Sequence, residues 1–222
     1  MKIFIDSANL EAIEEALKRG FPSGITTNPS ILAKEPKTDF KKHFHKIIDL
    51  CRKYDRQIPV SVEVFAKDVA TIERQAYEFV EEFKYELLSV KVPIGWDELT
   101  VIRKLVENKV IVNCTCCMSY NQAMMAANAG ATYVSIFSGR IRDIGYDANS
   151  VVREVHQTFR EFHSPAQIIV GSIRQINDIN DAIKSGADIV TVPPQFFKQL
   201  CNHPKTEEIV NQFVNDFQKW LT

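Results

Sequence analysis

The sequence lacks any long apolar run. No stretch approaches roughly 18 uninterrupted apolar residues, so we expect no segment to cross a membrane. The first residues, Met1–Asp6, turn acidic at once and lack the apolar core and small-residue cleavage site of a secretory signal peptide. The net charge is only −1, which gives no reason to expect nucleic acid or an anionic membrane as partner. Any anionic ligand must therefore be bound by a few specifically positioned side chains and not by a broad charged surface.

The five cysteines have no disulfide spacing, and their odd number favours a reducing compartment, so we expect a cytoplasmic protein. Three of them form a cluster with Thr115. Along a strand, Cys114 and Cys116 would face one side, while Thr115 and Cys117 would face the other. No second cluster of Cys or His completes four ligands, so we predict no metal site and interpret these cysteines as small core residues.

What the sequence does contain is a regular alternation of short β-branched runs with longer amphipathic stretches. Eight such units in series, without a linker or low-complexity segment, predict an α/β fold, a closed (β/α)8 TIM barrel. We expect strands at Lys2–Asp6, Gly24–Thr27, Pro59–Val64, Leu87–Val92, Val110–Cys116, Thr132–Phe137, Gln167–Gly171 and Asp188–Val192. We expect helices at Leu10–Arg19, Phe40–Arg52, Val69–Phe83, Asp97–Glu107, Asn121–Asn128, Ser150–Phe162 and Ile176–Lys184.

The chain is expected to form one domain over residues 1–222, with the barrel at about 1–204 and an additional C-terminal helix at about 205–222. The segment Thr206–Leu221 carries apolar residues near helical spacing, which need a covering surface. That surface is either the outside of its own barrel or a neighbouring subunit.

Polar residues fall at the carboxyl ends of the expected strands, where barrel enzymes place their reactive groups. There are more of them than we would expect on strands whose side chains served only to pack the core. They are Asp6, Thr26, Thr27, Asn28, Glu63, Lys91, Asn113, Thr115, Ser135, Arg140, Ser172 and Arg174.

Lys91 lies among branched apolar neighbours. An isolated strand lysine would more often extend its ammonium past the barrel rim into water. Burial instead favours the free amine, which can attack a carbonyl and form an imine. Asp6, Glu63 and Thr115 at other strand ends favour the second interpretation, because imine chemistry needs groups that move protons. Structural hydrogen bonds of the two carboxylates, and a core polar network of Thr115 and Asn113, are the alternatives.

Two arginines, Arg140 and Arg174, would direct positive charge at the same mouth. The planar guanidinium suits phosphate, and the Ser172 hydroxyl could add a donor. Surface salt bridges are the alternative for each arginine.

Several segments, in the same order, resemble transaldolases and cover the chain from residue 1 to about 204. The branch they resemble is the small, single-barrel one that also contains fructose-6-phosphate aldolases. The segments are Phe4–Ala8, Gly24–Ser30, Val62–Val64, Val90–Pro93, Tyr133–Arg140 and Gly186–Pro193.

The resemblance implies a cofactor-free reaction in carbohydrate metabolism, as in the pentose phosphate pathway. Lys91 would form the imine with the ketone of fructose 6-phosphate or sedoheptulose 7-phosphate, and Asp6 would take the hydroxyl proton as the C3–C4 bond breaks. Glu63 and Thr115 would hold the catalytic water. The dihydroxyacetone portion would bind Thr26, Asn28, Asn113 and Ser135, and the phosphate would bind Arg140, Ser172 and Arg174.

The resemblance also implies a homo-oligomer, a pentamer or decamer, in which the C-terminal helix contacts a neighbouring subunit. Within the branch, Glu63 and Phe137 are typical of dihydroxyacetone transfer to an aldose phosphate, where the aldolases have Gln and Tyr. Aldol cleavage and a non-catalytic sugar-phosphate-binding barrel are the alternatives. The chain departs from the family pattern at positions that shape the substrate: Cys114, Cys116, Cys117, Ile136, Ser138 and Ile144–Asp147.

Overall fold

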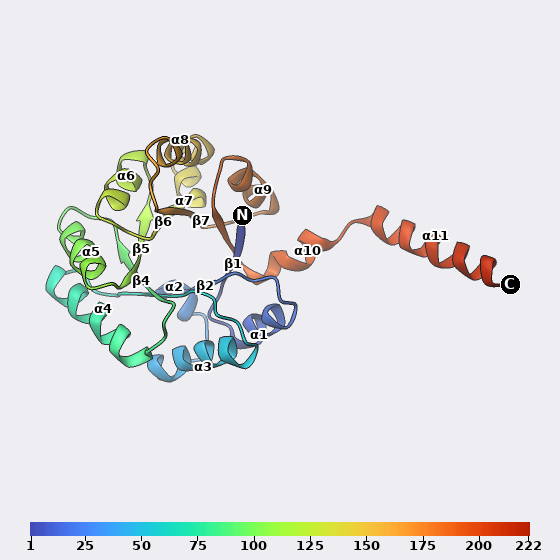
Figure 1. The fold of residues 1–222 in the computed structure, drawn as a ribbon, viewed down its shortest axis with the longest axis horizontal. Coiled ribbons are helices and arrows are strands. Elements are labelled where there is room, and N and C mark those ends of the chain that lie inside the picture. The colour runs from blue at the N-terminus through green and yellow to red at the C-terminus, as the bar shows by residue number, and fades with distance from the viewer.

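The computed structural model describes residues 1–222 and contains a closed barrel of eight parallel strands (Figure 1). The predicted TIM barrel is therefore confirmed, and each expected strand end lies within one residue of the observed one. Each strand pairs with its sequence neighbours, and β1 closes the barrel by pairing with β8. The strands are β1 (Lys2–Asp6), β2 (Ile25–Thr26), β3 (Val60–Glu63), β4 (Leu88–Pro93), β5 (Ile111–Cys117), β6 (Tyr133–Phe137), β7 (Gln167–Gly171) and β8 (Ile189–Val192).

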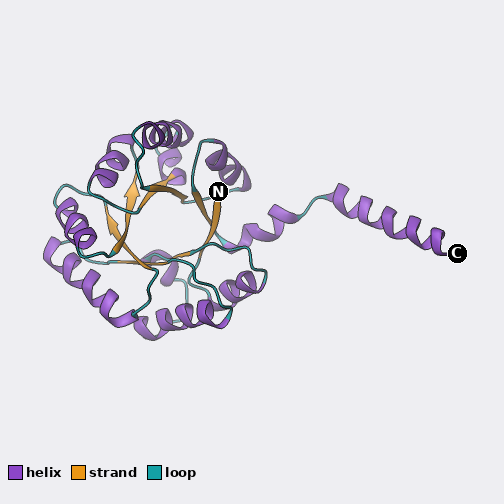
Figure 2. Cartoon of the chain, in the orientation of Figure 1, coloured by secondary structure: helices purple, strands orange, loops and turns teal.

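Helices form a ring outside the strands (Figure 2). Side chains such as Asn9, Asp39, Asp68 and Ser119 start them by accepting a hydrogen bond from a backbone N–H of the first turn. The helices are α1 (Leu10–Lys18), α2 (Pro29–Leu32), α3 (Phe40–Lys53), α4 (Val69–Phe83), α5 (Glu98–Glu107), α6 (Tyr120–Asn128), α7 (Ser138–Asp143), α8 (Ala148–Glu161), α9 (Ile176–Lys184), a 3₁₀ turn (Pro194–Phe196), α10 (Phe197–Cys201) and α11 (Pro204–Leu221).

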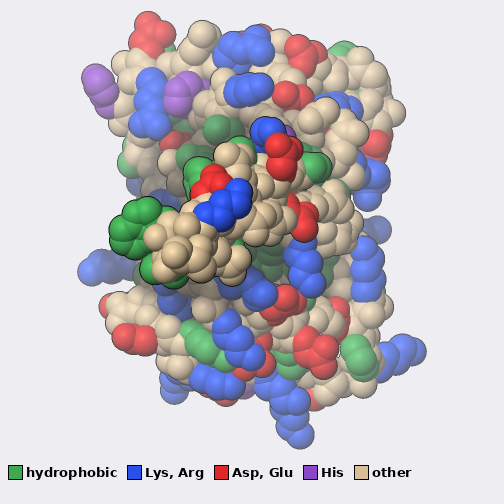
Figure 3. Space-filling view, turned by 90° about the vertical axis from the view of Figure 1, so that its right-hand side faces the viewer, with side chains coloured by type: hydrophobic (Ala, Val, Ile, Leu, Met, Phe, Trp, Pro, Cys, Tyr) green, Lys and Arg blue, Asp and Glu red, His purple; other side chains and the backbone are tan.

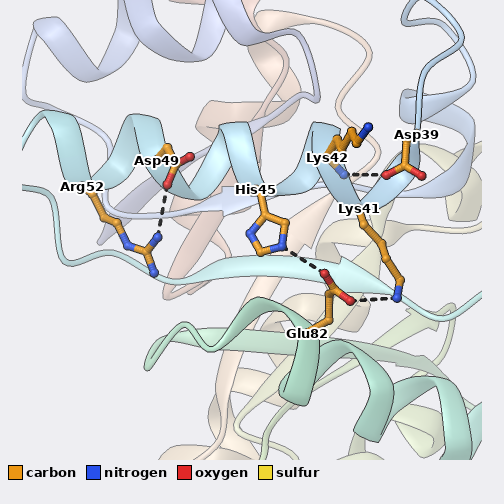
Figure 4. A network of polar contacts seen from close by, with 7 residues as sticks. All are labelled: Asp39, Lys41, Lys42, His45, Asp49, Arg52 and Glu82. Carbon is orange, nitrogen blue, oxygen red and sulfur yellow. Dashed lines mark hydrogen bonds and ion pairs between the residues drawn. The ribbon is translucent and has the colours of Figure 1, made fainter.

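The outer ring is held mainly by apolar packing. Between α3 and α4, Glu82 accepts hydrogen bonds from Lys41 at 2.7 Å and His45 at 3.1 Å (Figure 4). These groups are partly or largely solvent-exposed, so their contribution to stability is small. Beneath them, the Phe44 and Phe83 rings pack with centroids 4.5 Å apart, within a core of 47 buried residues between strands and helices. The contacts of Glu82 with Lys41 and His45 therefore add little to the apolar contact of Phe44 with Phe83, which contributes more to joining the two helices.

Inside the barrel, the side chains change from apolar to polar along the axis. A separate small core of Phe4, Tyr133, Ile169 and Ile189 occupies the lower, amino-terminal part. Since side chains two residues apart on a strand share a face, the same strands present polar groups one layer higher. The polar residues of that layer are the partly exposed Asp6 and the buried Ser135 and Thr191, joined by the buried Asn113 of β5. The polar layer thus lies at the carboxyl ends of the strands, on an apolar floor.

The helix α11 projects away from the barrel (Figure 1), and Figure 3 views the molecule from the side on which this helix extends. None of its residues is buried, and Phe213, Phe217 and Trp220 are 65%, 58% and 78% exposed. Of the two surfaces considered for this segment, its own barrel does not cover it here. No helix of the chain is both long and apolar enough to cross a membrane.

Candidate active site

A cavity of about 320 Å³ opens at the carboxyl ends of the strands. It is the place where most of the sequence-predicted residues meet. Asn113 and Thr115 are fully buried and do not line it, and Arg174 also lies outside its lining. The predicted residues that line it are Asp6, Thr26, Asn28, Glu63, Lys91, Ser135, Phe137, Arg140 and Ser172.

Lys91 does not extend into water, because its side chain is only 4% exposed. The β3–β4 register places Glu63 beside it, and Nζ lies 2.8 Å from Glu63 Oε2. This contact is an ion pair, not an aligned hydrogen bond, since Oε2 has no hydrogen-bond partner of good geometry. Nζ also donates to the backbone oxygen of Thr27 at 2.8 Å. The rim-lysine alternative is therefore wrong, and the amine is held at the base of the cavity.

Asp6 is the second acid of the cavity. Burial raises its pKa above the ordinary value, and the Lys91 charge and a hydrogen bond of 2.8 Å from Thr26 Oγ1 only partly oppose this. The nearby charge of Glu63 adds to the rise in pKa. A carboxyl group with a raised pKa can exchange protons closer to neutral pH, which suits a general base.

Hydroxyl and amide groups surround the two acids. Ser135 Oγ donates to Asn113 Oδ1 at 2.7 Å, whereas Asn113 Nδ2 and Thr115 Oγ1 are buried and have no protein partner. A core polar network, the alternative considered for Asn113 and Thr115, therefore includes only the Oδ1 atom of Asn113. The Thr191 hydroxyl contacts the Thr26 hydroxyl and lines the cavity, although the sequence analysis did not single it out. Its inward position on the eighth strand is the signal that could have found it.

The cysteine cluster differs from the expected alternation. The β5–β6 register shifts between Cys114 and Cys117, and Cys116 has a left-handed backbone with φ of 61°. The extra residue of this bulge reverses the alternation. Cys114 and Cys117 are consequently both buried in the outer core, as core residues, while Cys116 lines the cavity. The prediction that Cys114 and Cys116 share a face is wrong, and so is the core assignment of Cys116.

Burial, together with the Glu63 charge, raises the pKa of the Cys116 thiol, although Lys91 partly opposes this. The thiol therefore stays protonated and is a weak nucleophile beside the lysine. No three His, Cys, Asp or Glu side chains lie together as ligands for a metal ion.

Backbone strain is concentrated at the cavity. Six non-glycine residues have positive φ, and four of them directly end helices, where this conformation is common. The other two, Cys116 and Ser172, both have φ of 61° and both line the cavity. Strained backbone of this kind persists where the surrounding structure holds a functional side chain in place.

The two arginines predicted to bind phosphate lie next to each other at the rim. Arg174 Nη2 is 2.7 Å from Asp143 Oδ2, and Arg140 Nη1 is 3.8 Å from the same oxygen. Gly139 lets the Ser172 backbone lie close to α7, because a Cβ there would be 2.1 Å from the Ser172 backbone oxygen. The salt-bridge alternative therefore describes both arginines in this structure, closely for Arg174 and at longer range for Arg140, which also lines the cavity.

The raised pKa of Asp6 makes a prediction about stability. The folded protein binds a proton at Asp6 more tightly than the unfolded chain does, so this contribution is complete below the ordinary carboxyl pKa and is lost as pH rises through the folded value. Asp6→Asn keeps the shape without the charge. Urea unfolding at a series of pH values should show a variant that becomes increasingly more stable than the wild type above about pH 4, up to a plateau.

Asp147→Asn is the matched control, since hydrogen bonds from Ser150 and the Asn149 backbone lower the pKa of Asp147. Its stabilising contribution develops below the ordinary carboxyl pKa and is complete above it, so this variant should be less stable than the wild type by a constant amount above about pH 4, where Asp6→Asn gains stability. Parallel pH profiles for Asp6→Asn and the wild type would contradict the burial effect.

Comparison with known proteins places this chain in a family. The family model described as Transaldolase/Fructose-6-phosphate aldolase matches residues 3–221. A probable transaldolase of Ruegeria pomeroyi is 36% identical over 220 residues, covering 98% of this chain and 97% of the relative. A probable transaldolase of Syntrophobacter fumaroxidans is 39% identical over 222 residues, covering 99% and 97%.

Solved structures share the fold at low identity. A thiamine phosphate pyrophosphorylase from Pyrococcus furiosus matches with a TM-score of 0.61 and 16% identity, over 86% of this chain and 85% of that one. A putative fructose-1,6-biphosphate aldolase from Coccidioides immitis gives 0.61 and 14%, over 86% and 76%. These likenesses establish only the barrel. The near-complete family match and the relatives above one-third identity show more: the chain belongs to the transaldolase/fructose-6-phosphate aldolase family.

Proposed function

We propose that this protein is a class I transaldolase that uses Lys91 as a Schiff-base nucleophile. It transfers a dihydroxyacetone unit from a ketose phosphate, fructose 6-phosphate or sedoheptulose 7-phosphate, to an aldose phosphate. The observation that carries the proposal is the buried Lys91 amine, 2.8 Å from a carboxylate at the base of a polar cavity. Membership of the family supports an enzyme of this kind.

Imine formation begins with loss of a proton from Lys91. Glu63 Oε2, at 2.8 Å, is positioned to accept it. The free amine adds to the C2 carbonyl of the ketose, and the carbinolamine oxygen leaves as water after protonation. Glu63 and Thr115 hold this water and return it when the imine is hydrolysed. The unpartnered hydroxyl of Thr115, on the strand next to Lys91, supports this role.

Carbon–carbon cleavage needs a base for the C4 hydroxyl. Asp6, with its raised pKa, takes that proton as the C3–C4 electrons move into the protonated imine and an enamine forms. The aldehyde product leaves. The enamine carbon then attacks the acceptor aldehyde, and Asp6 returns the proton to the new hydroxyl. Because the imine is itself the electron sink, the chemistry requires no cofactor.

Substrate binding divides between the floor and the rim of the cavity. Thr26, Asn28, Asn113 and Ser135 bind the dihydroxyacetone portion. Asn28 uses its Oδ1 to accept from Ile31 N at the start of α2, at 2.9 Å, which leaves its amide N–H groups for a sugar hydroxyl. At the rim, the substrate phosphate binds Arg140, Ser172 and Arg174.

Transfer is favoured over simple aldol cleavage by Glu63 and Phe137. A transferase must protect its enamine from protonation by water until the acceptor arrives. Phe137 lines the cavity and carries no hydroxyl that could hold a water molecule there. A cytoplasmic location is part of the same proposal.

Borohydride reduction in the presence of fructose 6-phosphate tests the nucleophile. The wild type should give a covalent adduct on the Lys91 peptide by mass mapping. Lys91→Met should abolish the adduct and lower transfer activity by roughly a thousandfold or more. Lys91→Met/Glu63→Gln is the folding control, because Lys91→Met alone leaves a buried carboxylate without its partner. A wild type without any adduct would support a non-catalytic sugar-phosphate-binding barrel.

A product assay separates the transferase from the aldolase. With fructose 6-phosphate as donor, transfer products should form only when erythrose 4-phosphate is present, since the enamine waits for an acceptor. Chromatography of products with and without the acceptor provides the measurement. Rapid release of free dihydroxyacetone in both samples would favour the aldolase.

The apolar face of α11 supports a subunit contact. At the root of this helix, a groove of about 580 Å³ between α1 and α10 is lined by Ile3, Ala16, Phe21, Phe197 and Leu200, among others. We propose that α11 of one copy packs into this groove of the next. Such a head-to-tail contact closes into a ring, in keeping with the expected pentamer or decamer.

Removing large apolar side chains from α11 should therefore dissociate the assembly. Phe217→Ser/Trp220→Ser deletes two stacked rings, with centroids 5.8 Å apart, and should shift the mass towards the monomer in light scattering. Gln218→Ser, on the same turn, should not. An unchanged mass for the double variant would contradict the proposed contact.

A further inference from the structure

An interleaved set of arginines and aspartates joins α7 to α9 beside the cavity. We call it the α7–α9 ionic cluster, and its deep half centres on Asp178, which is 3% exposed. Asp178 Oδ1 accepts from Arg142 Nη1 at 2.8 Å. Its Oδ2 accepts from the backbone N–H groups of Arg174 at 2.8 Å and Gln175 at 3.1 Å. This half fixes the loop between β7 and α9, which carries Ser172 and Arg174.

The outer half of the cluster centres on Asp143. Its Oδ2 lies 2.7 Å from Arg174 Nη2 and 3.8 Å from Arg140 Nη1. The three side chains are 45%, 53% and 64% exposed, in the order Asp143, Arg174, Arg140. Ion pairs this exposed are weak, so a bound anion can displace the carboxylate.

Arg174 lies beside the cavity without lining it. Its Nε and Ser172 Oγ lie 3.0 Å and 2.8 Å from the position that a Cβ on Gly139 would occupy. The arginine stem therefore passes next to Ser172, which lines the cavity, while the guanidinium turns to Asp143. A change in the outer torsions of the side chain would turn the guanidinium from Asp143 towards the cavity.

We propose that Asp143 sets the selectivity of this rim for phosphate by competing for Arg174. The inference rests on the proposed phosphate-binding role of Arg140, Ser172 and Arg174. The Asp143 carboxylate, with a single negative charge, occupies Arg174 when no phosphate is bound. A phosphate dianion, with more charge and more acceptor oxygens, displaces it. An unphosphorylated sugar leaves Arg174 with Asp143 and gains nothing from this arginine.

Asp143→Asn removes the competing charge at nearly unchanged volume. Calorimetric titration with inorganic phosphate at low ionic strength should show roughly two- to fivefold tighter binding, which corresponds to the loss of one exposed ion pair. In steady-state assays, KM for fructose 6-phosphate should fall by a similar factor while kcat is unchanged. KM for unphosphorylated fructose should not change.

Asp147→Asn is the matched control. It changes the net charge equally, four residues away, but Asp147 bonds only to Ser150 and Asn149 and forms no salt bridge with an arginine. Its phosphate affinity should equal that of the wild type. Asp178→Asn, checked for folding by its melting temperature, should weaken phosphate binding, because the loop carrying Arg174 loses its anchor.

Phosphate binding to Asp143→Asn that is unchanged or weaker would overturn the proposal and leave Asp143 as a residue that merely positions Arg174. Equal tightening in Asp147→Asn would also overturn it, since the effect would then come from overall charge. The titration does not depend on turnover. A failure of borohydride trapping at Lys91 would remove the proposed function, while the comparison of phosphate affinities would still decide the role of Asp143.

Discussion

The ion pair between Lys91 and Glu63 is the contact on which the rest of the site depends. A lone ammonium inside the barrel would cost several kcal/mol of desolvation. Glu63 on the adjacent strand and the Thr27 backbone oxygen offset this cost by contacting Nζ at 2.8 Å each. The same contacts hold the amine in place at the base of the cavity. The closed barrel makes this possible, because neighbouring strands fix the two side chains in register.

The surrounding structure combines rigid support with local strain. The outer core and the apolar floor hold the strands in place. Two strained residues, Cys116 and Ser172, change the direction of the backbone where β5 and β7 end. The ionic groups follow the same division. Buried Asp178 anchors a loop, whereas exposed Asp143 forms a pair that can break. The side chains near Lys91 are thus held most firmly, and those at the rim are held least firmly.

Much of the fold could be predicted from the sequence, because β-branched runs, helical periodicity and strand-end polar residues are local patterns. The strand ends agree within one residue, and most predicted site residues line one cavity. The bulge of β5 could not be predicted, since no glycine marks the left-handed residue Cys116. The helices α2 and α7 are too short to show a period. The contact of Arg174 with Asp143 joins the loop after β7 to the end of α7, two segments far apart in the sequence, which no local pattern encodes.

The apolar floor has a consequence for the order of events. Phe4, Tyr133, Ile169 and Ile189 fill the lower barrel, and Gly24 leaves room for the Phe4 ring, since a Cβ there would lie 2.4 Å from it. Because this floor closes the lower barrel, the cavity opens only at the carboxyl ends of the strands. Under the proposed chemistry, the first aldehyde must leave through this opening before the acceptor enters. Donor aldehyde and acceptor would then use the same opening in turn, as a ping-pong sequence requires.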